Sequence, residues 1–138
     1  MTLSHPARLM AGLTLITVPT IVYGGLTLLA VVTGNAHGLS PAPELSPAQQ
    51  ALFRAGHAHA GVLVILSLVL QVLLDSATLP ERVRWGARVL AVAGAILVSG
   101  GFFGLAFFPG FATVLWLGAA SVSTAVLLAG IGLVRRPA

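Results

Sequence analysis

The sequence predicts an all-α integral membrane protein in which a single domain, residues 1–138, forms a bundle of four membrane-spanning helices. Of its residues, 57% are hydrophobic and only 7% are charged, whereas a soluble domain carries about 25% charged residues. Too few polar side chains are present to cover a globule with water-facing groups. The apolar residues also fall into four segments, each long enough for a transmembrane helix of roughly 20 residues.

Each of the four predicted spans should be helical, because hydrocarbon does not tolerate unpaired backbone groups. The spans cover residues 9–32, 55–74, 83–106 and 111–134. The first follows Arg8, and we expect it to be retained rather than cleaved as a signal peptide. Its apolar run exceeds a typical signal core, and no convincing small-residue cleavage site follows it.

Prolines mark an expected kink and an expected turn. Pro19 should kink the first span, and the hydroxyls of Thr17 and Thr20 should satisfy the backbone groups that the proline frees. Pro109 and Gly110 should form the short turn between the third and fourth spans.

Helix start signals precede the second and third spans. Ser46, Pro47 and Gln49 form a capping box with proline at the first helical position, so the second helix should begin at Pro47. Thr78 and Glu81 have the same spacing and predict a second capping box at the start of the third helix.

The third span carries small residues at four-residue spacing. Helices in lipid associate mainly through close packing of such residues. We expect this stripe to pack inside one bundle, and a seam between two copies is the alternative interpretation. The stripe consists of Ala87, Ala91, Ala95 and Ser99, with a second ridge at Gly100 and Gly104.

The arginines predict the orientation. With four spans, all but Arg54 fall on one side of the membrane, and the positive-inside rule places that side, with both termini, in the cytoplasm of a cell with an inner membrane. The net charge of +4 is therefore interpreted as a topology signal, and nucleic acid is not an expected partner. The arginines of the inner side are Arg8, Arg82, Arg84, Arg88, Arg135 and Arg136.

Two histidines, His57 and His59, lie in the outer turns of the second span. Polar groups inside a span are functional candidates by default. Residues two apart on an α-helix are rotated by about 200°, so the two rings should leave opposite faces and cannot chelate one ion. One ring should face the bundle interior, and the other ring should face another helix or another subunit. The alternative is a pair of interfacial histidines bonded to backbone or water.

The face of His57 has features that suit a heme. Gly61, one turn after His57, leaves room for a flat macrocycle, and Arg54, one turn before it, can pair with a propionate. Phenylalanines at the same end are interpreted either as an interfacial aromatic belt or as the wall of an apolar pocket. They are Phe53, Phe102, Phe103, Phe107, Phe108 and Phe111.

The His-x-His stretch of His57, Ala58 and His59 resembles the heme-bearing helix of the large subunits of heme–copper oxidases and nitric-oxide reductases. This resemblance implies two axial ligands that point to opposite sides and bind separate hemes. The longer stretch R-A-G-H-A-H-A-G-V-L, residues 54–63, resembles a motif of small four-span bacterial membrane proteins. That second resemblance implies the span count and layout but no activity.

A metal site is the alternative to heme. His37 and Glu44 share the outer loop, and together with His57 or His59 they would suit zinc or copper. The sequence contains no cysteine, which excludes disulfides, thiolate nucleophiles and iron–sulfur clusters.

The leading hypothesis is a membrane protein that binds b-type heme or a metal near its outer face, with His57 and His59 as ligands and a role in electron transfer or small-molecule redox chemistry. It would work with a membrane redox partner and form a homo-oligomer through the second or third helix, so that a partner covers the outward histidine. A non-catalytic membrane subunit or assembly factor is the second hypothesis. A small transporter is the third, and the lack of acidic residues at mid-depth counts against it.

Overall fold

The computed structural model describes residues 2–34 and 44–135 of the chain, and these residues form four α-helices and no strand. The helices are α1 (His5–Thr33), α2 (Pro47–Leu73), α3 (Glu81–Leu105) and α4 (Phe111–Val134). At 1.5 Å per residue they are about 36 to 44 Å long. All four are long and apolar enough to cross a membrane. The predicted all-α four-helix bundle with four candidate spans is therefore confirmed.

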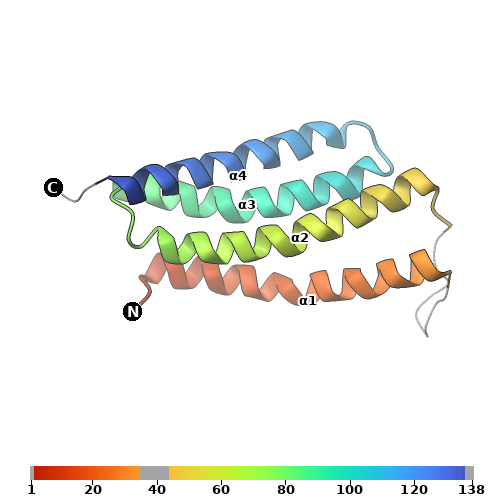
Figure 1. The fold of residues 1–138 in the computed structure, drawn as a ribbon, viewed down its shortest axis with the longest axis horizontal. Helices are drawn as coiled ribbons and strands as arrows, with labels where there is room; N and C mark the ends of the chain where they lie inside the picture. Colours follow the sequence, from red (N-terminus) through yellow and green to blue (C-terminus); the bar gives the residue numbers. More distant parts are fainter. Residues whose placement is uncertain (1, 35–43, 136–138) are drawn as a thin grey trace.

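The helices form an up-and-down bundle in which α1 is the outermost member. In Figure 1, α1 lies beside α2, and α4 lies on the far side of α3, while both marked chain ends are at the same end of the bundle. Among the described residues, α1 packs mainly on α2, has a small contact with α3 and has none with α4. The tightly packed part of the molecule is therefore formed by α2, α3 and α4.

Glycines allow α3 and α4 to approach closely. A Cβ atom added at Gly94 of α3 would lie 2.6 Å from Cγ2 of Val122, and one added at Gly118 of α4 would lie 2.6 Å from the backbone nitrogen of Val98. Real Cβ contacts are longer than this, so each glycine sits where the opposite helix leaves no room for a side chain. This reciprocal contact fixes the register of α3 against α4.

The small-residue stripe of α3 is buried within the chain. Its members all have less than a tenth of their surface exposed. The interpretation as packing inside one bundle is therefore confirmed, and the stripe does not present a free seam to a second copy. Part of it belongs to the main apolar core, which consists of Leu70, Leu74, Ala77, Ala87, Ala91, Ala125 and Ala129.

One predicted capping box is present and the other is not. Ser46 accepts from the backbone N–H of Gln49, and the Gln49 side chain accepts from the backbone N–H of Ser46, so α2 begins at Pro47 as expected. The Thr78–Glu81 box was wrong. Pro80 precedes the first helical residue of α3, and no side chain caps this helix. Thr78 bonds to the end of α4 instead: its backbone N–H donates to Gly132 O, and its hydroxyl donates to Arg135 O.

The surroundings of Pro19 differ from the prediction in one detail. α1 continues through Pro19 and changes direction near its middle (Figure 1). The hydroxyls of Thr17 and Thr20 bond to the carbonyls of Thr14 and Thr17, respectively. The carbonyl that loses its usual donor is that of Leu15, four residues before the proline, so the expected rescue by these threonines was wrong.

Candidate functional site

The two histidines of α2 lie on opposite sides of the helix. His57 is partly buried and faces α1, where a Cβ atom added at Gly25 would lie 3.0 Å from its Cε1 atom. His59 is exposed and faces α3, with its ring centroid 4.8 Å from that of Phe102. The two rings therefore serve two different environments, as their spacing on the helix predicts.

The ring of His59 is oriented by its own helix. Its Nδ1 atom lies 2.7 Å from the carbonyl oxygen of Ala55. A carbonyl can only accept, so Nδ1 is the donor of this bond, which leaves Nε2 as the ring nitrogen that is free to bind another group. The ring borders a groove of about 360 Å³ between α2, α3 and α4. Apolar and aromatic side chains, including Leu63, Phe102 and Trp116, form most of the groove wall.

The ring of His57 borders a different cavity, of about 350 Å³, between α1, α2 and α3. Small residues such as Gly24, Ala60 and Ala95 hollow out this space, and Phe103 lines its end beside His57. Most of the wall is apolar. The polar residues that line it are Thr14, Thr17, Thr20, His57, Ser67 and Ser99.

The other residues of the predicted metal and heme sites are Arg54, Gly61, Glu44 and His37. Arg54 and Glu44 are exposed, and no neighbouring atom lies within 4 Å of a Cβ added at Gly61. His37 lies outside the described residues. Within residues 2–34 and 44–135, no group of three or more histidines and carboxylates is close enough to hold a metal ion. The mixed site of His37, Glu44 and a helix-two histidine is thus not assembled by the part of the chain that can be described.

The phenylalanines divide between the two interpretations. Phe103 lines the His57 cavity and packs on Phe53 with ring centroids 5.4 Å apart, and Phe102 stacks on His59. Phe107 and Phe108 are exposed at the end of α3. The first group therefore forms pocket walls, and the second has the placement of an aromatic belt.

At the opposite end of the bundle the structure contains a buried polar cluster centred on Arg88. The Arg88 side chain is only 1% exposed. Its Nη2 atom donates to Oδ1 of Asp75 over 2.5 Å, and its Nη1 atom donates to the backbone carbonyl of Gln71 over 2.6 Å. Gln71 is fully buried and directs its amide toward the Arg88 carbonyl, with Nε2 and O 3.4 Å apart. The cluster therefore joins α3 to the end of α2.

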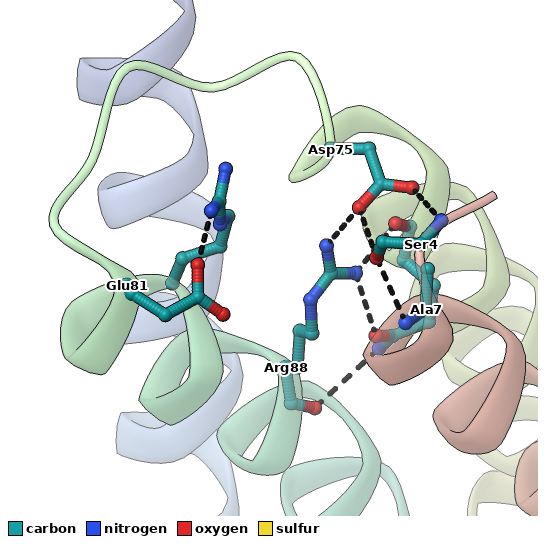
Figure 2. Close-up of polar contacts among 7 residues, drawn as sticks. Ser4, Ala7, Asp75, Glu81 and Arg88 are labelled. Atoms are coloured by element: carbon teal, nitrogen blue, oxygen red, sulfur yellow. Dashed lines mark hydrogen bonds and ion pairs between the residues drawn. The ribbon is translucent and has the colours of Figure 1, made fainter.

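Ser4 connects the same cluster to α1. Figure 2 shows that Ser4 is bonded to the Asp75 carboxylate, which also accepts a hydrogen bond from Arg88. The Ser4 hydroxyl donates to Oδ1 over 2.6 Å and its backbone N–H donates to Oδ2 over 2.9 Å. The same hydroxyl accepts from the backbone N–H of Ala7 and so caps α1. One carboxylate thus holds three helices together at this end.

These contacts change the acidity of Asp75. Partial burial raises the pKa of this carboxyl, but the hydrogen bonds from Ser4 and the Arg88 guanidinium outweigh burial and hold the pKa below its usual value. A carboxyl with a lowered pKa stabilises the fold while it is ionised, and it loses that contribution when it is protonated.

We therefore expect acid to loosen the cluster. Stability should stay constant from neutral pH to about pH 5 and fall below about pH 4, as Asp75 is protonated. The check is a series of melting temperatures in detergent between these values. An Asp75→Asn variant should start less stable and lose less on acidification, and an equal acid loss in both proteins would assign the effect to other carboxyls.

Sequence reasoning interpreted Arg88 only as one of several topology charges. A signal for its burial was nevertheless present. Arg88 lies three residues before Ala91 and therefore continues the small-residue stripe of α3, and Gln71 and Asp75 are one turn apart on α2. A polar residue in line with a buried stripe predicts a buried partner on the neighbouring helix.

Comparisons with protein-family models, with curated proteins and with solved structures found no match for this chain. Function is therefore inferred from the geometry of the molecule itself.

Proposed function

We propose that the protein is a membrane-embedded heme-binding protein with a redox or electron-transfer role, in which His59 is an axial ligand. The observation that carries this proposal is the bond from Nδ1 of His59 to Ala55 O. Metal-ligating histidines typically donate their second ring nitrogen to a carbonyl or carboxylate, which fixes the tautomer and directs the free lone pair. Phe102 and Trp116 supply apolar walls of the kind that a macrocycle contacts.

The donor set favours heme over a bare metal ion. Zinc and copper sites need three or four protein ligands, and the described residues bring no such group together. Heme supplies four nitrogen ligands itself and needs only one or two from the protein. When bound, it would supply the electron-accepting and electron-donating chemistry.

A second copy of the chain would complete the proposed site. His59 is exposed on the outside of the bundle, and its groove is open on one side. His57 faces α1 instead. Arg54 and Gly61 each lie one turn from His57 and therefore on the side of α2 away from His59. Only the Arg54 and Gly61 of a neighbouring copy would reach a heme bound at His59. A homo-oligomer with α2 at the interface, most simply a twofold dimer, would cover the groove and the exposed side chains of Val62 and Ile65.

The proposed location is an inner membrane with both termini in the cytoplasm. The even number of spans puts both chain ends at one end of the bundle (Figure 1). The arginines of that end support a cytoplasmic assignment, while Arg54 lies at the other end, beside the histidines. The proposed heme would then lie near the outer face.

The proposal is tested by purifying the protein from heme-replete cells and recording a reduced-minus-oxidised spectrum. We expect a b-type spectrum that His59→Ala abolishes, with loss of at least about tenfold in heme affinity. His57→Ala is the matched control, because it removes an imidazole two residues away on the other side of α2, and it should retain the spectrum. A protein that stays colourless after incubation with hemin contradicts the proposal.

The second candidate, a non-catalytic membrane subunit or assembly factor, is favoured by one aspect of the same geometry. The bond to Ala55 and the contact with Phe102 already satisfy much of the His59 ring, as a purely structural residue in lipid requires. Under this candidate, His59→Ala would alter the association state or stability and leave every heme spectrum blank.

A further inference from the structure

Ser67 of α2 has an unsatisfied hydroxyl that faces the His57 cavity. The residue is 1% exposed and lines the cavity, and its Oγ atom has no hydrogen-bond partner among the described residues. A buried donor without a partner is costly and calls for an explanation. The usual partner of a helical serine, a carbonyl one turn back in its own helix, is available but not used.

The other hydroxyls of the cavity behave differently. Thr14 and Ser99 donate to the carbonyls of Met10 and Ala95, and Thr17 and Thr20 also bond within α1. Their protons are committed to their own helices. Ser67 is therefore the hydroxyl that can donate to something inside the cavity.

The position of Ser67 limits what that occupant can be. At 1.5 Å per residue, Ser67 lies about 15 Å along α2 from His57 and about 12 Å from the level of Asp75. It is therefore well inside a hydrocarbon layer of about 30 Å. The cavity runs along α2 from the level of Ser67, where Thr14 and Val92 also line it, to the level of His57, where Gly24 and Phe103 line it.

The cavity opens sideways toward the lipid. Its wall between α1 and α3 includes Thr20, which is exposed, and Ile96, which is 58% exposed. Because α1 packs mainly on α2, it does not close this side against α3. An occupant would therefore enter from the bilayer and must itself be soluble in lipid.

We infer that this cavity binds a lipid-soluble quinone, with a quinone carbonyl accepting the hydrogen bond of Ser67. The occupant needs a largely apolar body to suit the walls and an acceptor oxygen deep in the membrane. A phospholipid acyl chain offers no acceptor at that depth, since its ester oxygens stay near the headgroups. A quinone carries carbonyl oxygens on a flat ring that moves within the hydrocarbon, and the small residues Ala60, Ala95 and Gly100 leave room for such a ring.

This inference is independent of the proposed heme site. The cavity lies on the His57 side of α2, and His59 borders the other groove. Loss of quinone binding and loss of heme can therefore be measured separately, with different variants.

The test is calorimetric titration of the full chain in detergent with a decyl-substituted benzoquinone. Ser67→Ala removes the donor and should weaken binding about fivefold to tenfold, the range expected for one neutral hydrogen bond. Ser99→Ala is the matched control, because it removes a hydroxyl of the same cavity that is bonded to Ala95 O, and it should change affinity by less than about twofold. Decylbenzene, which lacks the carbonyls, should bind wild type and Ser67→Ala equally.

A folding defect in Ser67→Ala would not explain weaker quinone binding by this variant. Ser67→Ala removes a buried unsatisfied group, so its melting temperature without ligand should equal or exceed that of the wild type. Absence of saturable quinone binding overturns the inference, as does equal weakening by Ser67→Ala and Ser99→Ala. Co-purified phospholipid that is retained by the wild type and lost from Ser67→Ala would also overturn it, in favour of a lipid site.

Discussion

Replacement of Asp75 by alanine should lower the free energy of unfolding by about 3–5 kcal/mol, the loss typical of removing one partner of a buried ion pair. The reason is the guanidinium of Arg88, which is 1% exposed and receives its counter-charge from Asp75. Removing the carboxylate leaves a buried charge with only the carbonyl groups of Gln71 as partners. It also releases Ser4 and with it the start of α1.

The measurement is unfolding of the purified protein in mixed micelles of increasing denaturing detergent. Glu81→Ala is the matched control, because Glu81 pairs with Arg84 at the same end of the bundle but in an exposed position. Exposed pairs contribute about 0–1 kcal/mol. The double replacement of Asp75 by alanine and Arg88 by leucine should recover much of the loss, since no buried charge remains. Equal, small effects of Asp75→Ala and Glu81→Ala would show that Arg88 reaches water without its partner.

Gly118→Ala should destabilise the bundle by about 1–3 kcal/mol, although a single methyl group is added. The new Cβ atom would meet backbone atoms of α3, 2.6 Å from the nitrogen of Val98 and 2.9 Å from the carbonyl carbon of Leu97. Backbone atoms cannot rotate away as a side chain can, so α3 and α4 must separate. The melting temperature in detergent reports this change.

Gly130→Ala on the same helix is the control for the intrinsic effect of the substitution. No neighbouring atom lies within 4 Å of a Cβ added there, and the residue is exposed. Alanine is the better helix former by about 0.5–1 kcal/mol, so this variant should be as stable as the wild type or more so. If Gly118→Ala also proves neutral, the two helices are packed less closely than the structure shows.

The sequence was sufficient for the fold because each span carries its own signal. Length and hydropathy predicted four helices, and the capping box at Ser46 predicted where α2 begins. The start of α3 was mispredicted because Thr78 has a competing partner, the end of α4, which is distant in sequence. Local patterns do not reveal such long-range competition for a donor.

The sequence predicted the directions in which His57 and His59 point but not the residues that surround each ring. The helical period determines that His57 and His59 point apart. Which helix each ring meets depends on bundle packing, which placed Gly25 against His57 and Phe102 beside His59. The burial of Arg88 was missed because the same residue type serves both as a topology signal and as an interior ion-pair partner, and composition does not distinguish the two roles.

The Asp75–Arg88 pair also constrains how the chain can be made. Arg88 follows Asp75 by 13 positions, so the two opposite charges belong to one hairpin of α2 and α3 and their contact needs only these two helices. Ser4 is synthesised first, and its partner Asp75 follows 71 residues later. The contact between Ser4 and Asp75 therefore forms only after the whole of α2 has been synthesised.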